Sequence, residues 1–157
     1  MIEFNQGSNY TGKVNIKLLH NNSEVLNITQ HNNGTKAFLE YIANVVSGQV
    51  SVTTKPGLIP GKLGFLGANI PLVSYSDIRA TKYDNENNYS YYSLQFVIPS
   101  SYINKGDTFS ELCLFPLNVN SFDESQMYAS IKLDKDIVVD DSNMSLIVEW
   151  VLAFSNY

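Results

Sequence analysis

The residue types that carry most enzymatic chemistry are few in this chain, and none stands in a catalytic spacing. The two histidines, His20 and His31, flank one predicted strand and could meet at one end of a hairpin. Two imidazoles with an Asp or Glu could hold a metal ion there. No H-x-H or HExxH spacing accompanies them, so we predict solvated turn histidines, no bound metal and no other cofactor.

Acidic residues form three close groups, each in a segment that reads as a turn or loop. Two carboxylates that face each other across a groove can hydrolyse glycosides. Asp is also favoured in turns for its backbone geometry alone, and no Asp-x-Asp-x-Asp-Gly calcium loop is present. We therefore predict that these carboxylates are structural and that the protein is not an enzyme. The groups are Asp123-Glu124, Asp134 with Asp136, and Asp140-Asp141.

Cys113 is the only cysteine, so the chain cannot form an internal disulfide or a multi-cysteine zinc site. A lone cysteine in an apolar strand usually acts as a small buried hydrophobe, and we predict that role here. The sequence also has no G-x-S-x-G nucleophile elbow and no phosphate-binding loop.

Four tyrosines near a polar segment offer the one recognisable binding chemistry. Flat aromatic rings stack on sugar faces, so these residues could contact a host-surface glycan or a protein partner. The alternative is that they pack across a sheet or at a subunit interface, as tyrosines in strands often do. The four residues are Tyr83, Tyr89, Tyr91 and Tyr92.

One helix is predicted near residues 35–47, where the apolar side chains follow a helical period. Thr35 is a suitable N-cap, and Gly48 is a suitable residue just beyond the C-terminus. A single helix among strands is expected to cover a sheet edge or to plug one end of a barrel or sandwich.

The remaining periodicity predicts about eight short strands with no internal repeat. This pattern favours a single domain over residues 1–157, folded as a mainly β, antiparallel sandwich of the jelly-roll or Ig-like kind. An exposed hairpin end is expected at residues 84–88. The predicted strands include Gly12–Leu19, Glu24–Thr29, Ser90–Pro99, Thr108–Phe115, Met127–Leu133 and Ser145–Ser155, and a short strand at Lys62–Leu66 is an option within a structured loop.

The last predicted strand is apolar on both faces except at Glu149. Such a strand cannot expose one whole face to water, so either the helix packs behind it or its outer face meets another subunit. On the second alternative, Ile147, Glu149 and Val151 are the candidate oligomer interface. We also expect Glu149 or Glu111 to pair with a cation or a backbone amide, since both acids lie in apolar strands.

The charge balance argues against a nucleic-acid partner. Ten Lys and Arg against 15 Asp and Glu give a net charge of −5, and the basic residues are not clustered. No apolar stretch approaches the roughly 20 residues that a membrane helix needs. The first residues lack the basic and apolar regions of a secretory signal, so no leader is expected.

Three C-terminal segments resemble virion proteins of tailed bacteriophages. These segments are FSELCLF at 109–115, YASI at 128–131 and VEWVLAFS at 148–155. The helical stretch after Asn33-Gly34-Thr35 resembles the N-terminal part of such proteins. Head-fibre and auxiliary capsid proteins of crAss-like and related phages are the most similar, although Cys113 stands where their pattern has Gly.

This resemblance implies a structural protein of the virion, assembled in the host cytoplasm. It further implies a homo-oligomer, with a trimer favoured, that contacts capsid or fibre subunits. A tail or baseplate component and a carbohydrate-binding module are the alternatives. The resemblance carries no catalytic residue to this chain.

Overall fold

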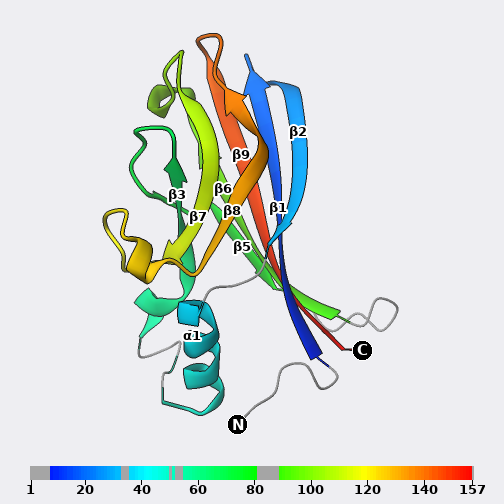
Figure 1. The fold of residues 1–157 in the computed structure, drawn as a ribbon, viewed down its shortest axis with the longest axis vertical. Helices are drawn as coiled ribbons and strands as arrows, with labels where there is room; N and C mark the ends of the chain where they lie inside the picture. The colour runs from blue at the N-terminus through cyan, green and yellow to red at the C-terminus, as the bar shows by residue number, and fades with distance from the viewer. Residues whose placement is uncertain (1–7, 33–35, 50, 52–54, 81–88, 157) are drawn as a thin grey trace.

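The computed structural model describes the backbone of residues 8–32, 36–49, 51, 55–80 and 89–156, and the side chains of residues 12–31, 37–49, 51, 55–80 and 92–152. Two antiparallel sheets pack face to face over these residues (Figure 1). The predicted mainly β, antiparallel sandwich with one α-helix is confirmed.

The larger sheet has five strands in the order β2-β1-β9-β6-β5, and the smaller has four in the order β4-β3-β7-β8. The five are β1 (Ser8–His20), β2 (Ser23–Asn32), β5 (Asp77–Ala80), β6 (Tyr89–Ile98) and β9 (Met144–Asn156). The four are β3 (Pro60–Leu66), β4 (Val73–Ser74), β7 (Thr108–Pro116) and β8 (Ala129–Val138). Short 3₁₀ turns are η1 (Pro56–Leu58), η2 (Ser100–Tyr102) and η3 (Glu124–Gln126).

The core lies between the two sheets and is built around the inward row of β9. Alternate side chains of β9 are buried, four of them with 2% or less of their surface exposed, because successive residues of a strand point to opposite faces. Trp150, the largest, is aligned with Val14 of β1 and Leu94 of β6. The four β9 residues are Leu146, Val148, Trp150 and Leu152.

The helix α1 (Lys36–Val46) lies at the end of the sandwich where β1 begins and β9 ends (Figure 1). Phe38 is buried, and its ring lies 5.4 Å from that of Tyr128. Tyr41 stacks on the same Tyr128 ring, also at 5.4 Å. The helix therefore plugs one end of the sandwich, which was one of the two predicted placements.

The C-terminus of the helix is closed by the predicted Gly48, which has a φ of +78°. The Gly48 N–H donates to the Val45 carbonyl at 3.1 Å, and the Gln49 N–H donates to the Asn44 carbonyl at 3.0 Å. These two bonds form a Schellman motif, which satisfies carbonyls that the helix end leaves unpaired. The predicted N-cap Thr35 lies outside the described residues.

The four-stranded sheet has a second, smaller core on its outer face. Cys113 and Phe115 point outward there and are fully buried, together with Val119. Lys62 ties down the covering segment, because its Nζ donates to the Val119 carbonyl at 2.7 Å and to Asn120 Oδ1 at 3.2 Å. The predicted burial of Cys113 is thus confirmed, and this sheet is covered on both faces near β7.

Nine strands are present in the described part of the chain, one more than the estimate of about eight. The short strand β4 has two residues and lies in a segment whose glycines and prolines hide any strand period. Strands β5 and β6 pair as the arms of the predicted hairpin. The tip of that hairpin, residues 84–88, lies outside the described residues.

A matched pair of glycine variants tests this packing. Gly67 and Gly106 have φ values of +97° and +98°, but a Cβ at Gly67 would lie 2.5 Å from the Thr108 carbonyl oxygen, whereas a Cβ at Gly106 meets nothing within 4 Å. In each Ala variant the positive φ lowers the free energy of unfolding by about 1–3 kcal/mol, because a side chain disfavours this backbone conformation. Gly67→Ala should lose at least a further 1 kcal/mol, roughly, through the steric clash. Equal losses of unfolding free energy for the two variants in denaturant titrations would contradict the close approach of Gly67 to the Thr108 carbonyl.

Candidate functional site

The two sheets differ in what covers their outer faces. Residues 117–122 fold over the four-stranded sheet near β7, where Phe122 packs against Phe115 with ring centroids 5.2 Å apart. Within the described residues, no element covers the outer face of the five-stranded sheet (Figure 1). We call this uncovered surface the outer face, and we take it as the candidate functional site.

Three cross-strand rows make up the centre of the outer face. Each row joins one residue of β1, one of β9 and one of β6, held in register by the backbone ladder. The first row is apolar between β9 and β6, the second is polar throughout, and the third has an aliphatic residue between two polar ones. The rows are Lys17–Ile147–Val97, Asn15–Glu149–Gln95 and Lys13–Val151–Ser93.

The three predicted interface residues are therefore neighbours on one outward surface. Ile147 and Val151 are half-buried, while Glu149 between them is exposed. The strand β9 is central, as one alternative required, but the helix does not pack behind it. The helix lies at the end of the sandwich instead, so the outward side of β9 has no cover among the described residues.

The two strand carboxylates are less buried than the sequence pattern indicated. Glu149 is exposed and has no hydrogen bond or ion pair with any described residue. Glu111 is half-buried and aligned with Lys132 of β8, with no ion pair of 4.0 Å or less between them. The expected pairing of Glu149 or Glu111 is thus not found among the described residues, because the sheet leaves the outward row of β9 in contact with solvent. Pairing across a subunit contact stays a prediction.

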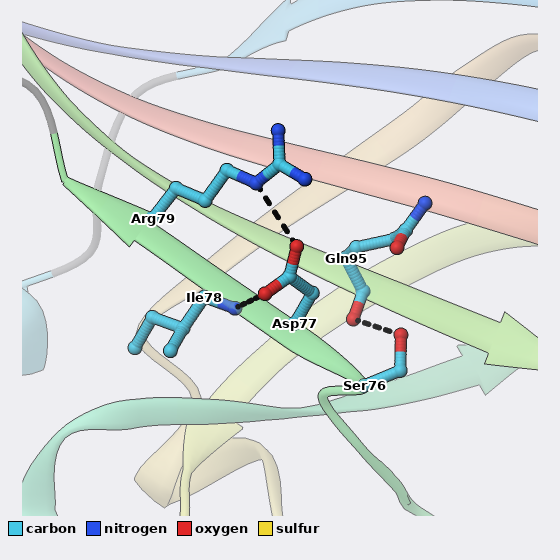
Figure 2. Close-up of polar contacts among 5 residues, drawn as sticks. All are labelled: Ser76, Asp77, Ile78, Arg79 and Gln95. Carbon is cyan, nitrogen blue, oxygen red and sulfur yellow. Dashed lines mark hydrogen bonds and ion pairs between the residues drawn. The ribbon is translucent and has the colours of Figure 1, made fainter.

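A small polar hollow lies on the outer face where β5, β6 and β9 meet. Asp77 anchors it: its Oδ2 accepts from Arg79 Nε at 3.0 Å, and its Oδ1 accepts from the Ile78 N–H at 3.0 Å. Figure 2 shows Asp77, Arg79 and the Gln95 amide on one side of the strands and Ile78 directed away from them. The hollow measures about 160 Å³ and is lined by Asp77, Arg79, Ser93, Gln95 and Glu149.

The opposite margin of the outer face is held rigid by side-chain amides. Asn15 Nδ2 donates to Asn27 Oδ1 at 2.7 Å and to Thr29 Oγ1 at 2.9 Å. The outer face thus carries an aliphatic centre, a fixed amide cluster on one side and a charged hollow on the other. Such a surface can recognise polar groups of either charge.

Of the four predicted contact tyrosines, only Tyr92 has a described side chain. Tyr83 lies outside the described residues, and Tyr89 and Tyr91 are placed only as backbone in β6. Tyr92 is half-buried and packs against the core, and its hydroxyl donates to the Pro60 carbonyl at 3.2 Å. Burial, followed by the neighbouring hydroxyls of Tyr75 and Tyr41, raises the pKa of Tyr92. Tyr92 therefore fits the packing alternative.

Tyr92 also lines an apolar cavity of about 310 Å³ between the helix and the sheets. The Tyr128 hydroxyl donates to the Leu58 carbonyl at 2.6 Å beside this region, so main-chain carbonyls hold both phenols in place. The other lining residues are Phe38, Tyr41, Ile42, Ile59, Pro60, Ile78 and Leu152.

The two histidines do not meet at one end of the hairpin. His20 is aligned with Ser23 at the turn, whereas His31 is aligned with Lys13 at the far end of the same hairpin. Seven residues of extended strand separate these positions, which is roughly 24 Å at about 3.4 Å per residue. His20 instead lies 3.3 Å from Asp141. Among the described residues there is no group of three His, Cys, Asp or Glu side chains that could hold a metal ion.

Two of the three acidic groups have local structural partners. Asp123 is the N-cap of η3, and its Oδ1 accepts from the backbone N–H and the hydroxyl of Ser125 at 3.0 and 2.7 Å. Hydrogen bonds from Ser125 and Gln126 lower the pKa of Asp123. Asp141 accepts from the Ser142 N–H at 2.8 Å beside His20.

Comparisons with protein-family models, curated proteins and solved structures found no significant match to this chain. Among the described residues, no helix is long and apolar enough to cross a membrane. The fold alone defines the class of protein, an antiparallel β-sandwich with one end plugged by a helix.

The buried thiol should make the protein sensitive to alkali. Burial, with smaller contributions from Glu111 and Glu124, raises the pKa of Cys113 from 9.0 to about 12. The folded state then keeps the thiol protonated in a range where the unfolded chain ionises it. The stability due to this protonated thiol is fully present below pH 9 and is lost as the pH rises from 9 toward 12.

We therefore expect the free energy of unfolding to fall more steeply above pH 9 in the wild type than in Cys113→Ala. At pH 8 the folded protein should not react with a thiol reagent, and the denatured protein should react fully. Parallel pH profiles for the two proteins, or rapid labelling of the folded protein, would show that Cys113 is accessible.

Proposed function

We propose that this chain is a non-enzymatic structural subunit that acts by associating with copies of itself and with other proteins. The outer face is its contact surface. The observation that carries this proposal is the position of Ile147 and Val151, two half-buried aliphatic residues at the centre of an uncovered sheet. Burial of aliphatic surface is the main driving force of protein association.

The charges around these residues support the same function. Lys13 and Lys17 lie on β1, Glu149 lies on β9, and Asp77 lies on β5. A second copy can therefore meet this surface with opposite charges, which favours a defined orientation over nonspecific aggregation. The amide cluster around Asn15 adds fixed hydrogen-bonding groups at the margin.

The place of this subunit in a virion rests on the resemblance of the C-terminal segments to phage proteins. On that basis we propose a capsid-attached head fibre or decoration subunit, with a trimer as the favoured assembly and other virion proteins as partners. A tail or baseplate component is the alternative within the same class. A two-layer sandwich with a plugged end is a compact unit that is compatible with either role.

Sedimentation velocity over a range of concentrations tests this proposal, because it gives both the presence and the size of an oligomer. Val151→Lys should shift the wild-type oligomer toward monomer, since a lysine buried at the contact loses its hydration. The matched control is Val46→Lys, which changes a residue of α1 that is 69% exposed and lies away from the outer face.

The control variant should sediment as the wild type does, and thermal unfolding should show that both variants are folded. A wild-type protein that stays monomeric at every concentration would refute self-association. Equal effects of the two substitutions would refute the outer face as the contact surface.

A further inference from the structure

The side of the sandwich between β2 and β8 is closed at one end and open at the other. Gln30 closes it: its Nε2 donates to the Lys132 carbonyl at 3.1 Å, and its Oε1 accepts from the Asp134 N–H at 3.0 Å. The Gln30 side chain thus forms two backbone hydrogen bonds with β8 that a neighbouring strand would otherwise form. Beyond Asp134, toward Val138, no hydrogen bond joins the two strands among the described residues.

The open part is a cleft lined by residues near the β1–β2 and β8–β9 turns. These turns lie at the end of the sandwich opposite the helix (Figure 1). The cleft consists of two adjoining hollows of about 370 and 150 Å³, and both are lined by Leu18, Leu26 and Val138. We call it the β2/β8 cleft. Its deep side reaches the core, because Leu18 and Met144 line it and are themselves buried.

The walls of the β2/β8 cleft are more apolar than an ordinary sheet edge. Val25 is 55% exposed, Leu26 is 37% exposed and Val138 is 56% exposed. These three residues face one cleft from two neighbouring strands and are not scattered singly over the surface. Clustered exposed aliphatic residues with a polar rim are typical of a surface that binds another protein.

Irregular pairing on both strands limits how a partner can bind. Val25 is an extra residue between the pairs Leu18–Leu26 and Leu19–Glu24. In β8, residues 133–136 stand opposite the single residue Ser110 of β7. Such bulges bend a strand and interrupt a regular ladder, so a long added strand is disfavoured. A short segment that inserts a side chain fits this geometry better.

The rim of the cleft is mainly acidic. Asp136, Asp140 and Asp141 line it, against Lys135 and His20. Asp141 already contacts His20 at 3.3 Å, whereas Asp136 and Asp140 have no hydrogen bond or ion pair with a described residue. The whole chain also carries a net charge of −5. A cationic partner is therefore favoured over an anionic one.

We propose that the β2/β8 cleft binds a short segment of another protein that carries an aliphatic side chain next to Lys or Arg. The aliphatic side chain enters between Leu26 and Val138, and the cation lies against Asp136 and Asp140. This site is separate from the outer face, so the inference stands whether or not the chain self-associates.

The test is a titration of ¹⁵N-labelled protein with a blocked hexapeptide of alternating Leu and Lys, followed by NMR. The largest shifts are expected at the amides of Leu18, Leu26 and Val138. Val138→Asn should weaken binding at least tenfold, roughly the loss that 1.4 kcal/mol gives. Val46→Asn is the matched control, and it should bind the peptide as the wild type does.

Two further comparisons separate a specific site from general attraction to an acidic protein. The double variant Asp136→Asn, Asp140→Asn should weaken binding, and a hexapeptide of alternating Leu and Glu should not bind. Val151→Lys should leave peptide binding unchanged, because Val151 lies on the outer face and not in the cleft. The peptide titration therefore tests the cleft independently of the proposed self-association. Absence of saturable shifts at the cleft, or equal binding of the two peptides, would overturn the proposal.

Discussion

The inward row of β9 is the constraint on which the rest of the structure depends. Trp150 and its three inward neighbours are fully or almost fully buried at the centre of the larger sheet. They are shielded only if β1 and β6 flank β9 and the smaller sheet covers them. The indole Nε1 has no partner among the described residues, a cost of about 1–3 kcal/mol. Burial of the large ring against both sheets stabilises the folded state by a free energy of the same order or greater.

The period of two along β9 links this core to the candidate site. Once Val148 and Trp150 point inward, Ile147, Glu149 and Val151 must point outward, and register aligns them with β1 and β6. The smaller sheet hides its own outward residues under a segment that Lys62 holds in place. The larger sheet has no such cover in the described part of the chain, so its outer face is the sheet surface left for contacts.

Local patterns predicted much of the fold, and long-range contacts explain most of what they missed. Alternation at Val14 and Ile16 and the glycine at 48 gave correct element types, since each depends on neighbours in sequence. Sequence alone left open whether the two histidines meet, and the hairpin register separates them. The polar hollow could not be foreseen because its residues come from β5, β6 and β9, and β9 is far from the other two strands in the sequence. The β2/β8 cleft could not be foreseen because Gln30 bonds to a strand about 100 residues further along the chain.

Lysine labelling of the wild-type protein at low and high concentration decides whether the chain associates through the outer face. Lys13 lies on that face, whereas Lys55 and Lys105 are also exposed but lie elsewhere. Mass spectrometry after reductive methylation gives a rate for each residue. Self-association through the outer face should slow the labelling of Lys13 at high concentration and leave the rates at Lys55 and Lys105 unchanged. Unchanged rates at all three lysines would contradict it.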